Sequence, residues 1–470
     1  MINKKIIFLS ITFVFLLLSC SSDDDYQAIP EPEPRVTNEI ELLGGETTIF
    51  NKSPNAFGFF ARNLSQEEEI TFGIGNSLFN QSWVTAPAST TARDGLGPLF
   101  NARSCSGCHF KDGRGAPPEF EGEKASGLLV RLSVPGTDEF GNNLPEPVYG
   151  GQLQDNAILG INVEGDLKIT TTPILITYPD GEKVTLFKPE YSFANLKYGA
   201  MSANVQISPR VANHMVGLGL LDAIAENDLL QLADVNDSDT DGISGKPNYV
   251  YDVVTNSKKL GRFGWKANQP NLKQQVASAF AGDLGITSSL FPQENYPFGV
   301  DITTIASGGS PELIDESLDK VTFYSGTLAV PIRRNINDPK IITGKKLFEQ
   351  INCTACHIDT FTTGDYPIKA LGNQKIHPYT DLLLHDMGKE LADNTPDFEA
   401  TGTEWRTPPL WGIGLIEKVN GHTRFMHDGR ARNFEEAILW HGGEAETSKN
   451  DFMNLKKEDR NNLILFLESL

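Results

Sequence analysis

The stretch NARSCSGCHF, residues 101–110, separates Cys105 from Cys108 by two residues and follows them at once with His109. A second stretch, CTACH, repeats this spacing with Cys353, Cys356 and His357. Two cysteines this close to a histidine can form a disulfide, hold a zinc ion or attach a haem. Each of these choices requires a different fold around the motif.

Cysteine usage along the whole chain favours haem. The chain has five cysteines, and the two Cys-x-x-Cys-His motifs contain all of them except Cys20. Disulfides would not explain a histidine after each pair, and zinc sites more often join one CxxC to a second CxxC or to HxxxH. Cys-x-x-Cys-His is the attachment motif of c-type haem, whose iron the histidine binds. We therefore predict two covalent haems, with His109 and His357 as proximal iron ligands.

The first residues have the pattern of an export signal. Met1–Lys5 is basic, Ile6–Leu18 is almost wholly apolar, and Cys20 follows directly. This end resembles a bacterial lipobox, so we expect residues 1–19 to be a lipoprotein signal peptide and Cys20 to carry a lipid. The alternative is an ordinary signal peptide, with Cys20 discarded or free. Residues 20–40, rich in Asp, Glu and Pro, are expected to be a flexible tether.

Composition and charge narrow the range of partners. The net charge is −21 and the hydrophobic content is 39%, which suits a real core of two or three domains and disfavours nucleic acid as a partner. A docking protein would be basic, although the charge is also explained by solubility alone. No apolar run after the signal is long enough to span a bilayer. We therefore expect membrane attachment through the lipid only, on the periplasmic side, for example of the outer membrane, or at the cell surface.

Residues 331–470 are expected to form a small cytochrome c domain. The segment DPKIITGKKLFEQINCTACH has three apolar residues at helical spacing after Pro339: Leu347, Phe348 and Ile351. The last fifteen residues place four more on one helical face: Leu463, Phe466, Leu467 and Leu470. One helix leading into the haem motif and one closing amphipathic helix suit a domain that encloses a porphyrin.

Residues 41–330 are expected to form a larger N-terminal haem domain with a β-rich insertion at about 125–200. The segment PILITYPDGEKVTLF predicts a hairpin that turns at Pro179-Asp180-Gly181. Helical periodicity returns in VANHMVGLGLLDAIAENDLLQLA and in NLKQQVASAFAGDLG. The predicted fold class is mainly α, with two cytochrome c-like helical haem domains, the N-terminal one enlarged by this insertion.

An acidic loop, DSDTDGISG, is a candidate calcium site. Three aspartates alternate along it before Gly242, as in the first half of an EF-hand loop: Asp237, Asp239 and Asp241. The twelfth position is Asn248 instead of a bidentate glutamate. The alternative is a solvated acidic turn without a metal.

A histidine on a predicted helix is the best candidate for a further iron ligand. In NFEEAILWHGGEA, Asn433 caps the helix start and two glycines end it. Phe434, Ile438 and His441 fall on one face at helical spacing. A histidine on an apolar face is usually a hydrogen-bonded core residue. Beside a buried haem, iron ligation becomes the favoured interpretation.

Several of these motifs resemble those of the bacterial di-haem cytochrome c peroxidase superfamily, which includes the di-haem enzyme that matures methylamine dehydrogenase. The resemblance spans roughly residues 44–470 and rests on these stretches: GLGPLFNARSCSGCH, GRFGWKANQP, LLLHDMG, RTPPLWGIG and FMHDGRARNFEEAILWH. It is strongest to the branch named di-haem oxidoreductases or "thiol oxidoreductases". The second name has no support here, because the haem motifs and the expected lipid on Cys20 use every mature cysteine.

The resemblance assigns a distal ligand to the C-terminal haem. In the peroxidases a methionine stands fourteen residues after the histidine of an F-x-H-x-G motif. Here that histidine is His427, and His441 stands at the methionine position. Bis-histidine ligation would lower the reduction potential relative to His/Met. His427 itself is expected to support the haem edge.

The same resemblance implies an open N-terminal site. FGWKANQPNLKQQ aligns with a stretch that places Trp265 between the two haems, as an electron relay, and Gln275 in the distal pocket. Asp283 stands two residues before the position of a catalytic glutamate, and its alternative is a surface carboxylate. No histidine follows His109 until His214, so the distal histidine of the inactive peroxidases is missing. Fallback ligands are His214, Met215 and Met201.

The sequence thus predicts an exported di-haem c-type oxidoreductase. It would reduce hydrogen peroxide, or another small oxidant, or use it to oxidise a partner at the N-terminal haem, with Asp283 moving the proton. The C-terminal haem would relay electrons from a donor protein or small cytochrome. One alternative is a non-catalytic electron-transfer cytochrome. The other is a surface binding lipoprotein whose haems sense redox state.

Overall fold

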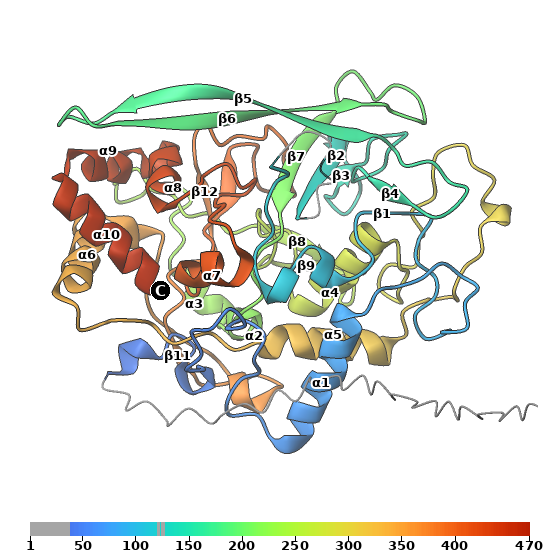
Figure 1. Cartoon of the computed structure of the whole chain (residues 1–470), viewed down its shortest axis with the longest axis horizontal. Helices are drawn as coiled ribbons and strands as arrows, with labels where there is room; N and C mark the ends of the chain where they lie inside the picture. The colour runs from blue at the N-terminus through green and yellow to red at the C-terminus, as the bar shows by residue number, and fades with distance from the viewer. Residues whose placement is uncertain (1–37, 120–122, 124–126) are drawn as a thin grey trace, which may run out of the picture. The chain divides into compact units, whose positions relative to one another are not determined.

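The computed structural model describes residues 38–119, 123 and 127–470 (Figure 1). The expected signal peptide, Cys20 and most of the expected tether lie outside the described residues. The described residues belong to one unit. The expected boundary between residues 330 and 331 stays a prediction.

Helices of the described residues are mostly short. In chain order they are α1 (Gln66–Asn80), α2 (Leu218–Asp222), α3 (Glu226–Leu230), α4 (Leu272–Ala279), α5 (Asp315–Thr327), α6 (Pro339–Gln350), α7 (Ile416–Asn420), α8 (Phe434–Trp440), α9 (Glu446–Asn454) and α10 (Lys457–Ser469). A π-helical turn, Phe280–Leu284, continues α4. Each haem motif begins with a 3-10 turn, at Cys105–Gly107 and at Cys353–Ala355.

Strands occur throughout the described chain and pair antiparallel in six small sheets. They are β1 (Leu99–Phe100), β2 (Leu128–Thr137), β3 (Asn143–Leu144), β4 (Asn156–Ala157), β5 (Asp166–Thr177), β6 (Lys183–Ala194), β7 (Gln206–Val211), β8 (Tyr249–Asp252), β9 (Ser257–Leu260), β10 (Phe361–Thr362), β11 (Lys375–Ile376), β12 (Leu384–Asp386) and β13 (Glu404–Arg406). The largest is the three-stranded sheet β3-β2-β7.

The expected mainly α fold class is wrong, because the protein is a mixed α/β fold. Only 29% of it is helical and about 20% is strand. Strands are not confined to the expected insertion at 125–200, since β8 to β13 follow it. The helical periodicity of residues 211–233 yields only α2 and α3, of five residues each. Apolar residues there are buried against neighbouring segments, and burial alone does not require a long helix.

Two pairs of crossing helices flank the haem motifs. Helix α1, which precedes the first motif, crosses α5, and α6, which leads into the second motif, crosses α10. Both crossings use a glycine: a Cβ on Gly75 would lie 2.2 Å from the carbonyl oxygen of Lys320, and one on Gly344 would lie 1.9 Å from that of Asn462. Both expected helices of the C-terminal part are confirmed, and the apolar face of α10 is largely buried.

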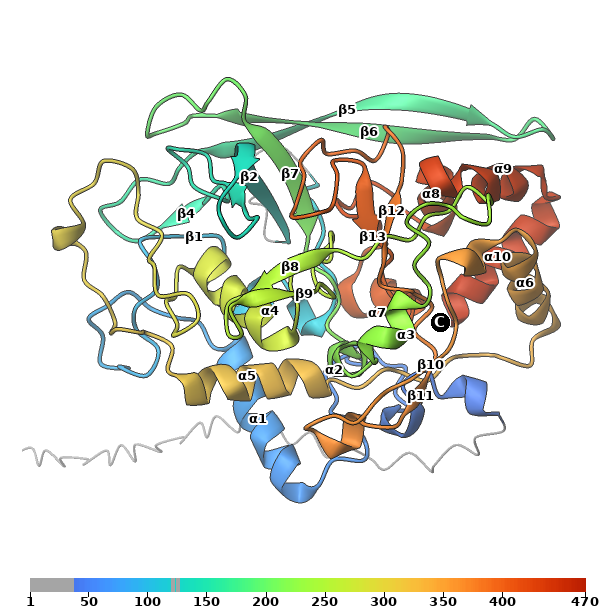
Figure 2. The ribbon, with the colours of Figure 1, turned by 180° about the vertical axis from the view of Figure 1, so that it is seen from behind.

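The β5–β6 hairpin crosses from the β2–β7 sheet to the C-terminal helices α8 and α9 (Figures 1 and 2). Its turn forms at the expected Pro179-Asp180-Gly181, where Gly181 has a positive φ of 88° and the N–H of Tyr178 donates to the carbonyl of Glu182. The predicted hairpin is therefore confirmed. Its tip packs on the C-terminal half of the chain: the Tyr178 hydroxyl donates to Glu435, and Arg460 pairs with Asp180 and Glu182.

One hydrophobic core includes side chains from both halves of the chain, for example Phe57 and Phe466, both fully buried. Helix α4 lies beside α5 in this core (Figure 2). Among the described residues, the helices are all too short or too polar to cross a membrane.

Candidate functional site

Both Cys-x-x-Cys-His motifs face one cavity of about 390 Å³. Its walls include all six motif residues: Cys105, Cys108, His109, Cys353, Cys356 and His357. These four cysteines are free, so the disulfide alternative finds no support. Burial raises the pKa of Cys105 and of Cys353 to about 12, so both groups are protonated thiols at pH 7.

His109 and His357 are held in the same way. The Nδ1–H of His109 donates to the backbone carbonyl of Asn213 at 2.7 Å, and that of His357 donates to the carbonyl of Tyr379 at 2.9 Å. Burial lowers the pKa of both rings, that of His357 to about 4, so both are neutral at pH 7. A carbonyl on Nδ1 fixes the tautomer that leaves the Nε2 lone pair free for a metal.

His441 repeats this arrangement at the end of α8. Its Nδ1–H donates to the carbonyl of Ala437 at 2.7 Å, and burial lowers its pKa. The ring lines the cavity together with Phe434 and Ile438, the two residues expected on its helix face. A charge on His441 lowers the pKa of His357, so the two rings interact across the cavity.

The other histidines are arranged differently. Both ring nitrogens of His385 are bound to carboxylates, Nε2 to Asp381 at 2.8 Å and Nδ1 to Glu444 at 2.6 Å. Burial would lower the pKa of His385, but these two partners raise it well above its usual value. His214 lines the cavity without a hydrogen bond at either nitrogen, and burial lowers its pKa to about 3.

The two fallback methionines are placed apart. Met215 lines the cavity, whereas Met201 packs in a separate apolar cluster around Tyr149 and Leu153. Of the three fallback ligands, the structure therefore brings only His214 and Met215 to the cavity.

Two segments 162 positions apart have the same local structure. Phe263 forms an isolated antiparallel β-bridge with Gln269, and Phe425 forms one with Ala431. Each bridge leads into a helix whose first turn is capped by an asparagine side chain. Asn271 accepts from the N–H of Gln274 at the start of α4, and Asn433 accepts from that of Glu436 at the start of α8. The two segments therefore share one local structure through the start of each helix, and each is called a unit below. Beyond it, α4 continues into the π-helical turn, whereas α8 ends at Trp440.

The cavity faces of the two units carry different side chains. The equivalent positions that line the cavity in both units include Gln275, Ala279 and Asp283 in the first and, 162 positions later, Ala437, His441 and Ala445 in the second. Ala279 thus stands where the second unit has its histidine. In the first unit, the small Ala279 lies between the amide of Gln275 and the carboxyl group of Asp283 in the sequence. In the second unit, the imidazole of His441 lies between two alanines.

Asp283 is half-buried in the π-helical turn after α4 and lines the cavity. Its Oδ1 accepts from Nε2 of Gln152 at 2.9 Å, and its backbone carbonyl accepts from the N–H groups of Asn101 and Ala102. Burial raises its pKa, and Arg131 and Gln152 oppose that rise. The alternative of a surface carboxylate is therefore not what the structure shows. Gln275 also lines the cavity, and its side-chain amide makes no hydrogen bond with a described residue.

Trp265 and His427 hold equivalent places in the two units, and both line the cavity. The carbonyl of Trp265 accepts from the N–H of Arg406, and that of His427 accepts from the N–H of Val211. The Trp265 indole N–H also donates to Val211. Gly217 stands six positions after Val211, and Gly412 stands six positions after Arg406. Both glycines have a φ of 76°. The two halves are thus joined by reciprocal backbone hydrogen bonds in the wall of the cavity that both haem motifs line.

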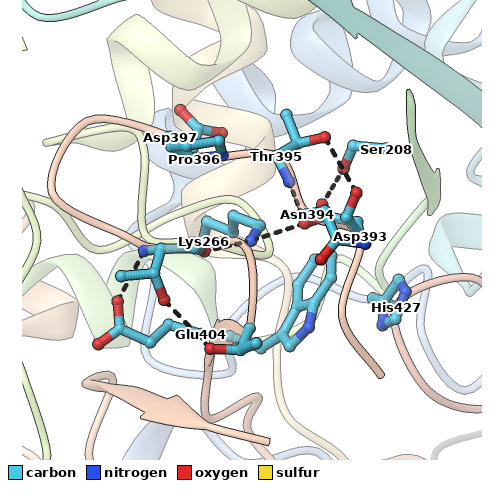
Figure 3. A network of polar contacts seen from close by, with 12 residues as sticks. Ser208, Lys266, Asp393, Asn394, Thr395, Pro396, Asp397, Glu404 and His427 are labelled. Carbon is cyan, nitrogen blue, oxygen red and sulfur yellow. Dashed lines mark hydrogen bonds and ion pairs between the residues drawn. The ribbon is translucent and has the colours of Figure 1, made fainter. Parts of the chain in front are cut away.

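A second tryptophan, Trp405, lies beside this junction. The ring of His427 stacks on it at 3.8 Å, and the Lys266 ammonium lies 4.3 Å from its centroid. Lys266 is fully buried, pairs with Asp393 at 3.0 Å and donates to the carbonyl of Thr401 (Figure 3). Trp405 directly precedes the RTPPLWGIG motif, but its sequence position alone does not show this contact.

Two buried arginines in the cavity wall fit an acidic ligand. Arg114 donates to the carbonyls of Arg424 and Met426, and Arg406 donates to that of Gly264. Neither forms an ion pair with a described carboxylate, and burial lowers the pKa of each to about 10. A buried guanidinium without a counter-ion is costly. Haem propionates would supply the missing charge, so these residues fit haem.

The acidic loop gathers a slightly different set of aspartates than expected. Ligand oxygens of Asp234, Asp237 and Asp239 lie within 4.8 Å of one another, and Asp241 is not among them. Asn248 is buried and bonds Lys266, Asp397 and Glu399, so it is not the twelfth ligand of an EF-hand. Calcium binding by this loop stays a prediction.

Two haem-type motifs facing one cavity, with neutral histidines and unpaired arginines in its wall, define a two-haem protein of mixed α/β fold. Residues 37–470 match the family described as "Di-haem oxidoreductase, putative peroxidase", and the chain belongs to this family. Its cofactors are therefore haems. No protein of curated function matches the chain. Among solved structures, a chain of hydrazine synthase from Kuenenia stuttgartiensis is 13% identical with a TM-score of 0.32, over 84% of this chain and 92% of that one.

Proposed function

We propose that the protein is an exported di-haem c-type oxidoreductase that reduces hydrogen peroxide at its N-terminal haem. The observation that carries this proposal is the exchange at one position of the two units, Ala279 in the first and His441 in the second. His357 and His441 could both bind the C-terminal iron. The N-terminal iron has His109 as a ligand and, at the position equivalent to His441, only the methyl group of Ala279. An iron with a free position can meet a small oxidant.

Covalent attachment of both haems is supported by the four free cysteines at the cavity wall. His109 and His357 would be the proximal ligands. Haem staining on denaturing gels and a pyridine haemochrome assay should give two covalent haems per chain. A haem-to-chain ratio near zero would contradict covalent c-type attachment. It would not contradict non-covalent haem binding, because the family assignment does not depend on covalent attachment.

The residues around the N-terminal site would handle the proton. When bound, haem iron would supply the electrons that break the peroxide O–O bond. Asp283, whose pKa burial raises, would accept a proton at a carboxylate oxygen and return it to the leaving oxygen. Gln275, with its free amide, would orient the peroxide. Trp265, in the wall between the two motifs, would relay electrons from the C-terminal haem.

A steady-state assay tests this function directly. The purified holoprotein should consume hydrogen peroxide with an artificial electron donor, and its ferric spectrum should contain one high-spin and one low-spin haem. Two low-spin haems and no reaction with peroxide would favour the electron-transfer cytochrome instead. The physiological donor would be a protein or small cytochrome, and the charge of −21 suggests that it is basic.

Export and anchoring through Cys20 complete the proposal and rest on the sequence pattern alone. The wild-type protein should partition with membranes and carry a lipid that is lost in Cys20→Ala. Release of an unlipidated wild-type protein would contradict the anchor and would leave the proposed reaction unaffected.

A further inference from the structure

Arg131 lines the cavity and has no side-chain partner among the described residues. It lies on β2, where its backbone bridges Gln152. Its guanidinium makes no hydrogen bond or ion pair with any residue that the structure describes. Arg114 and Arg406 instead donate to backbone carbonyls, and Arg210, the fourth arginine of the wall, pairs with Asp397 at 2.9 Å.

The guanidinium of Arg131 lies near the segment that carries Asp283. A Cβ on Gly282, the preceding residue, would lie 4.0 Å from Nη1 of Arg131 and 3.8 Å from Oε1 of Gln152. Arg131 lowers the pKa of Asp283, and Asp283 raises that of Arg131, each against the effect of burial. The two groups therefore interact, yet they form no ion pair within 4.0 Å.

Gln152 explains why the carboxylate does not turn to the arginine. Its Nε2 donates to Oδ1 of Asp283 at 2.9 Å and to Oδ1 of Asn101 at 2.6 Å. Oδ2 of Asp283 accepts no hydrogen bond from a described residue. The carboxylate is thus held through Oδ1. Its Oδ2 and the nearby guanidinium of Arg131 remain available to bind a small molecule.

We propose that Arg131 is the anion-binding group of the N-terminal site, and that it holds a small anion beside Asp283. This inference rests on the proposed function, in which the anion is hydroperoxide. Hydrogen peroxide gives one proton to a carboxylate oxygen of Asp283, and the electron pair of the broken O–H bond stays on the peroxide oxygen. The products are a neutral Asp283 carboxyl group and a hydroperoxide anion, so the total charge is unchanged. The guanidinium stabilises this anion with charge-assisted hydrogen bonds.

Fluoride is a suitable probe, because it binds ferric haem and takes no part in redox chemistry. Titration of the ferric holoprotein, followed by absorbance, should show that Arg131→Gln binds fluoride about 10- to 100-fold more weakly than wild type, as expected for a lost hydrogen bond to a charged group. Arg131→Lys should restore part of the affinity. The exposed Arg62 provides a matched control, and Arg62→Gln should bind fluoride like wild type.

Unchanged fluoride affinity in Arg131→Gln would overturn the inference. If that variant instead lost haem or shifted a reduction potential at unchanged fluoride affinity, Arg131 would hold a propionate, which also overturns it. Failure of the proposed function would look different. The wild-type protein would then not reduce peroxide, whatever its fluoride affinity and whatever the state of Arg131.

Discussion

The two candidate iron sites differ in whether a histidine stands at one equivalent position, which is Ala279 in the first unit and His441 in the second. His441 offers a neutral imidazole whose Nδ1 is already bound to Ala437, whereas Ala279 at the equivalent place offers a methyl group that cannot bind iron. The neighbouring positions change in the opposite sense, because Gln275 and Asp283 are polar where the second unit has alanines. One copy of the unit is equipped for ligation and the other for proton chemistry.

Replacement of Asp283 by asparagine should slow the peroxide reaction. The variant keeps the shape and the hydrogen bond from Gln152 but cannot move a proton. Peroxide turnover should fall by about 10²–10⁴-fold, the usual size of general acid–base assistance, at unchanged haem content and resting spectrum. The exposed Asp451 provides a control, and Asp451→Asn should be fully active. Full activity of Asp283→Asn would place the proton acceptor elsewhere.

The same carboxyl group should give the reaction a pH dependence. Proton acceptance needs the carboxylate form, and burial raises the pKa of Asp283 despite Arg131 and Gln152. The initial rate should therefore be highest above this raised pKa and fall about tenfold per pH unit below it, beginning at a higher pH than for an ordinary aspartate. Stopped-flow rates across pH 4.5–8 would check this. A flat wild-type profile, or an unchanged profile in Asp283→Asn, would contradict the assignment.

Replacement of His441 by alanine should open the C-terminal iron. One low-spin haem should become high-spin, with both haems still attached, as absorbance and electron paramagnetic resonance would show. His385→Ala is the informative comparison, because both nitrogens of His385 are bound to Asp381 and Glu444. If the low-spin signal is lost in His385→Ala and kept in His441→Ala, the iron ligand is His385 and not His441.

At the scale of elements, α4 and α8 begin in the same way. Each starts at an asparagine cap that follows an isolated β-bridge, at Asn271 and at Asn433. The two segments then differ, because α4 runs on into the π-helical turn Phe280–Leu284, whereas α8 ends at Trp440 and His441 has a ψ of 141°. Ala279 and His441 are therefore equivalent in the repeat, but their backbone conformations differ.

This repeat predicts that Ala279→His closes the N-terminal site. The new imidazole would line the cavity at the position equivalent to His441 in the repeat, so the high-spin haem should become low-spin and the reaction with peroxide should be lost. Absorbance spectra and an assay of peroxide consumption would measure both effects. Ala281→His is the matched control, since Ala281 does not line the cavity, and it should keep the high-spin haem. A high-spin haem in Ala279→His would show that the two units differ in geometry.

At the scale of the whole described chain, the β5–β6 hairpin ties an N-terminal segment to the C-terminal helices (Figure 1). Arg460 of α10, 2% exposed, donates to Asp180 and Glu182 at the hairpin tip and lies 4.0 Å from the centroid of Tyr178. Farther along, the hydroxyl of Tyr191 donates to Asp428, next to His427. The hairpin thus reaches the wall of the cavity.

Loss of this contact should destabilise the fold. Arg460→Ala removes buried hydrogen bonds and packing, so the free energy of unfolding should drop by about 1–3 kcal/mol, measured by denaturant titration of the holoprotein. Lys457→Ala is the control, because Lys457 contacts Glu182 from an exposed position, and its effect should be much smaller. Equal stabilities of the two variants would mean that the hairpin is not held by Arg460.

Motifs with fixed spacing could be predicted from the sequence because local chemistry imposes that spacing. The histidine after each CxxC, the cap at Asn433, the hairpin turn at Gly181 and the apolar face of α10 all depend on neighbours along the chain. The fold class could not be predicted in this way, because residues 211–233 have helical periodicity and yet form only two short helices.

The sequence by itself determined the two Cys-x-x-Cys-His motifs and the candidate ligand His441, because these follow from residue type and spacing. The candidate acid Asp283 came from the resemblance to the di-haem peroxidases. Only the tertiary structure placed Arg131 and Gln152 beside Asp283 and gathered Arg114, Arg406 and Trp405 around the same cavity. These residues come from distant segments and belong to no motif. Their chemistry depends on burial and on missing or present partners, which arise only when strands and helices far apart in the chain pack together.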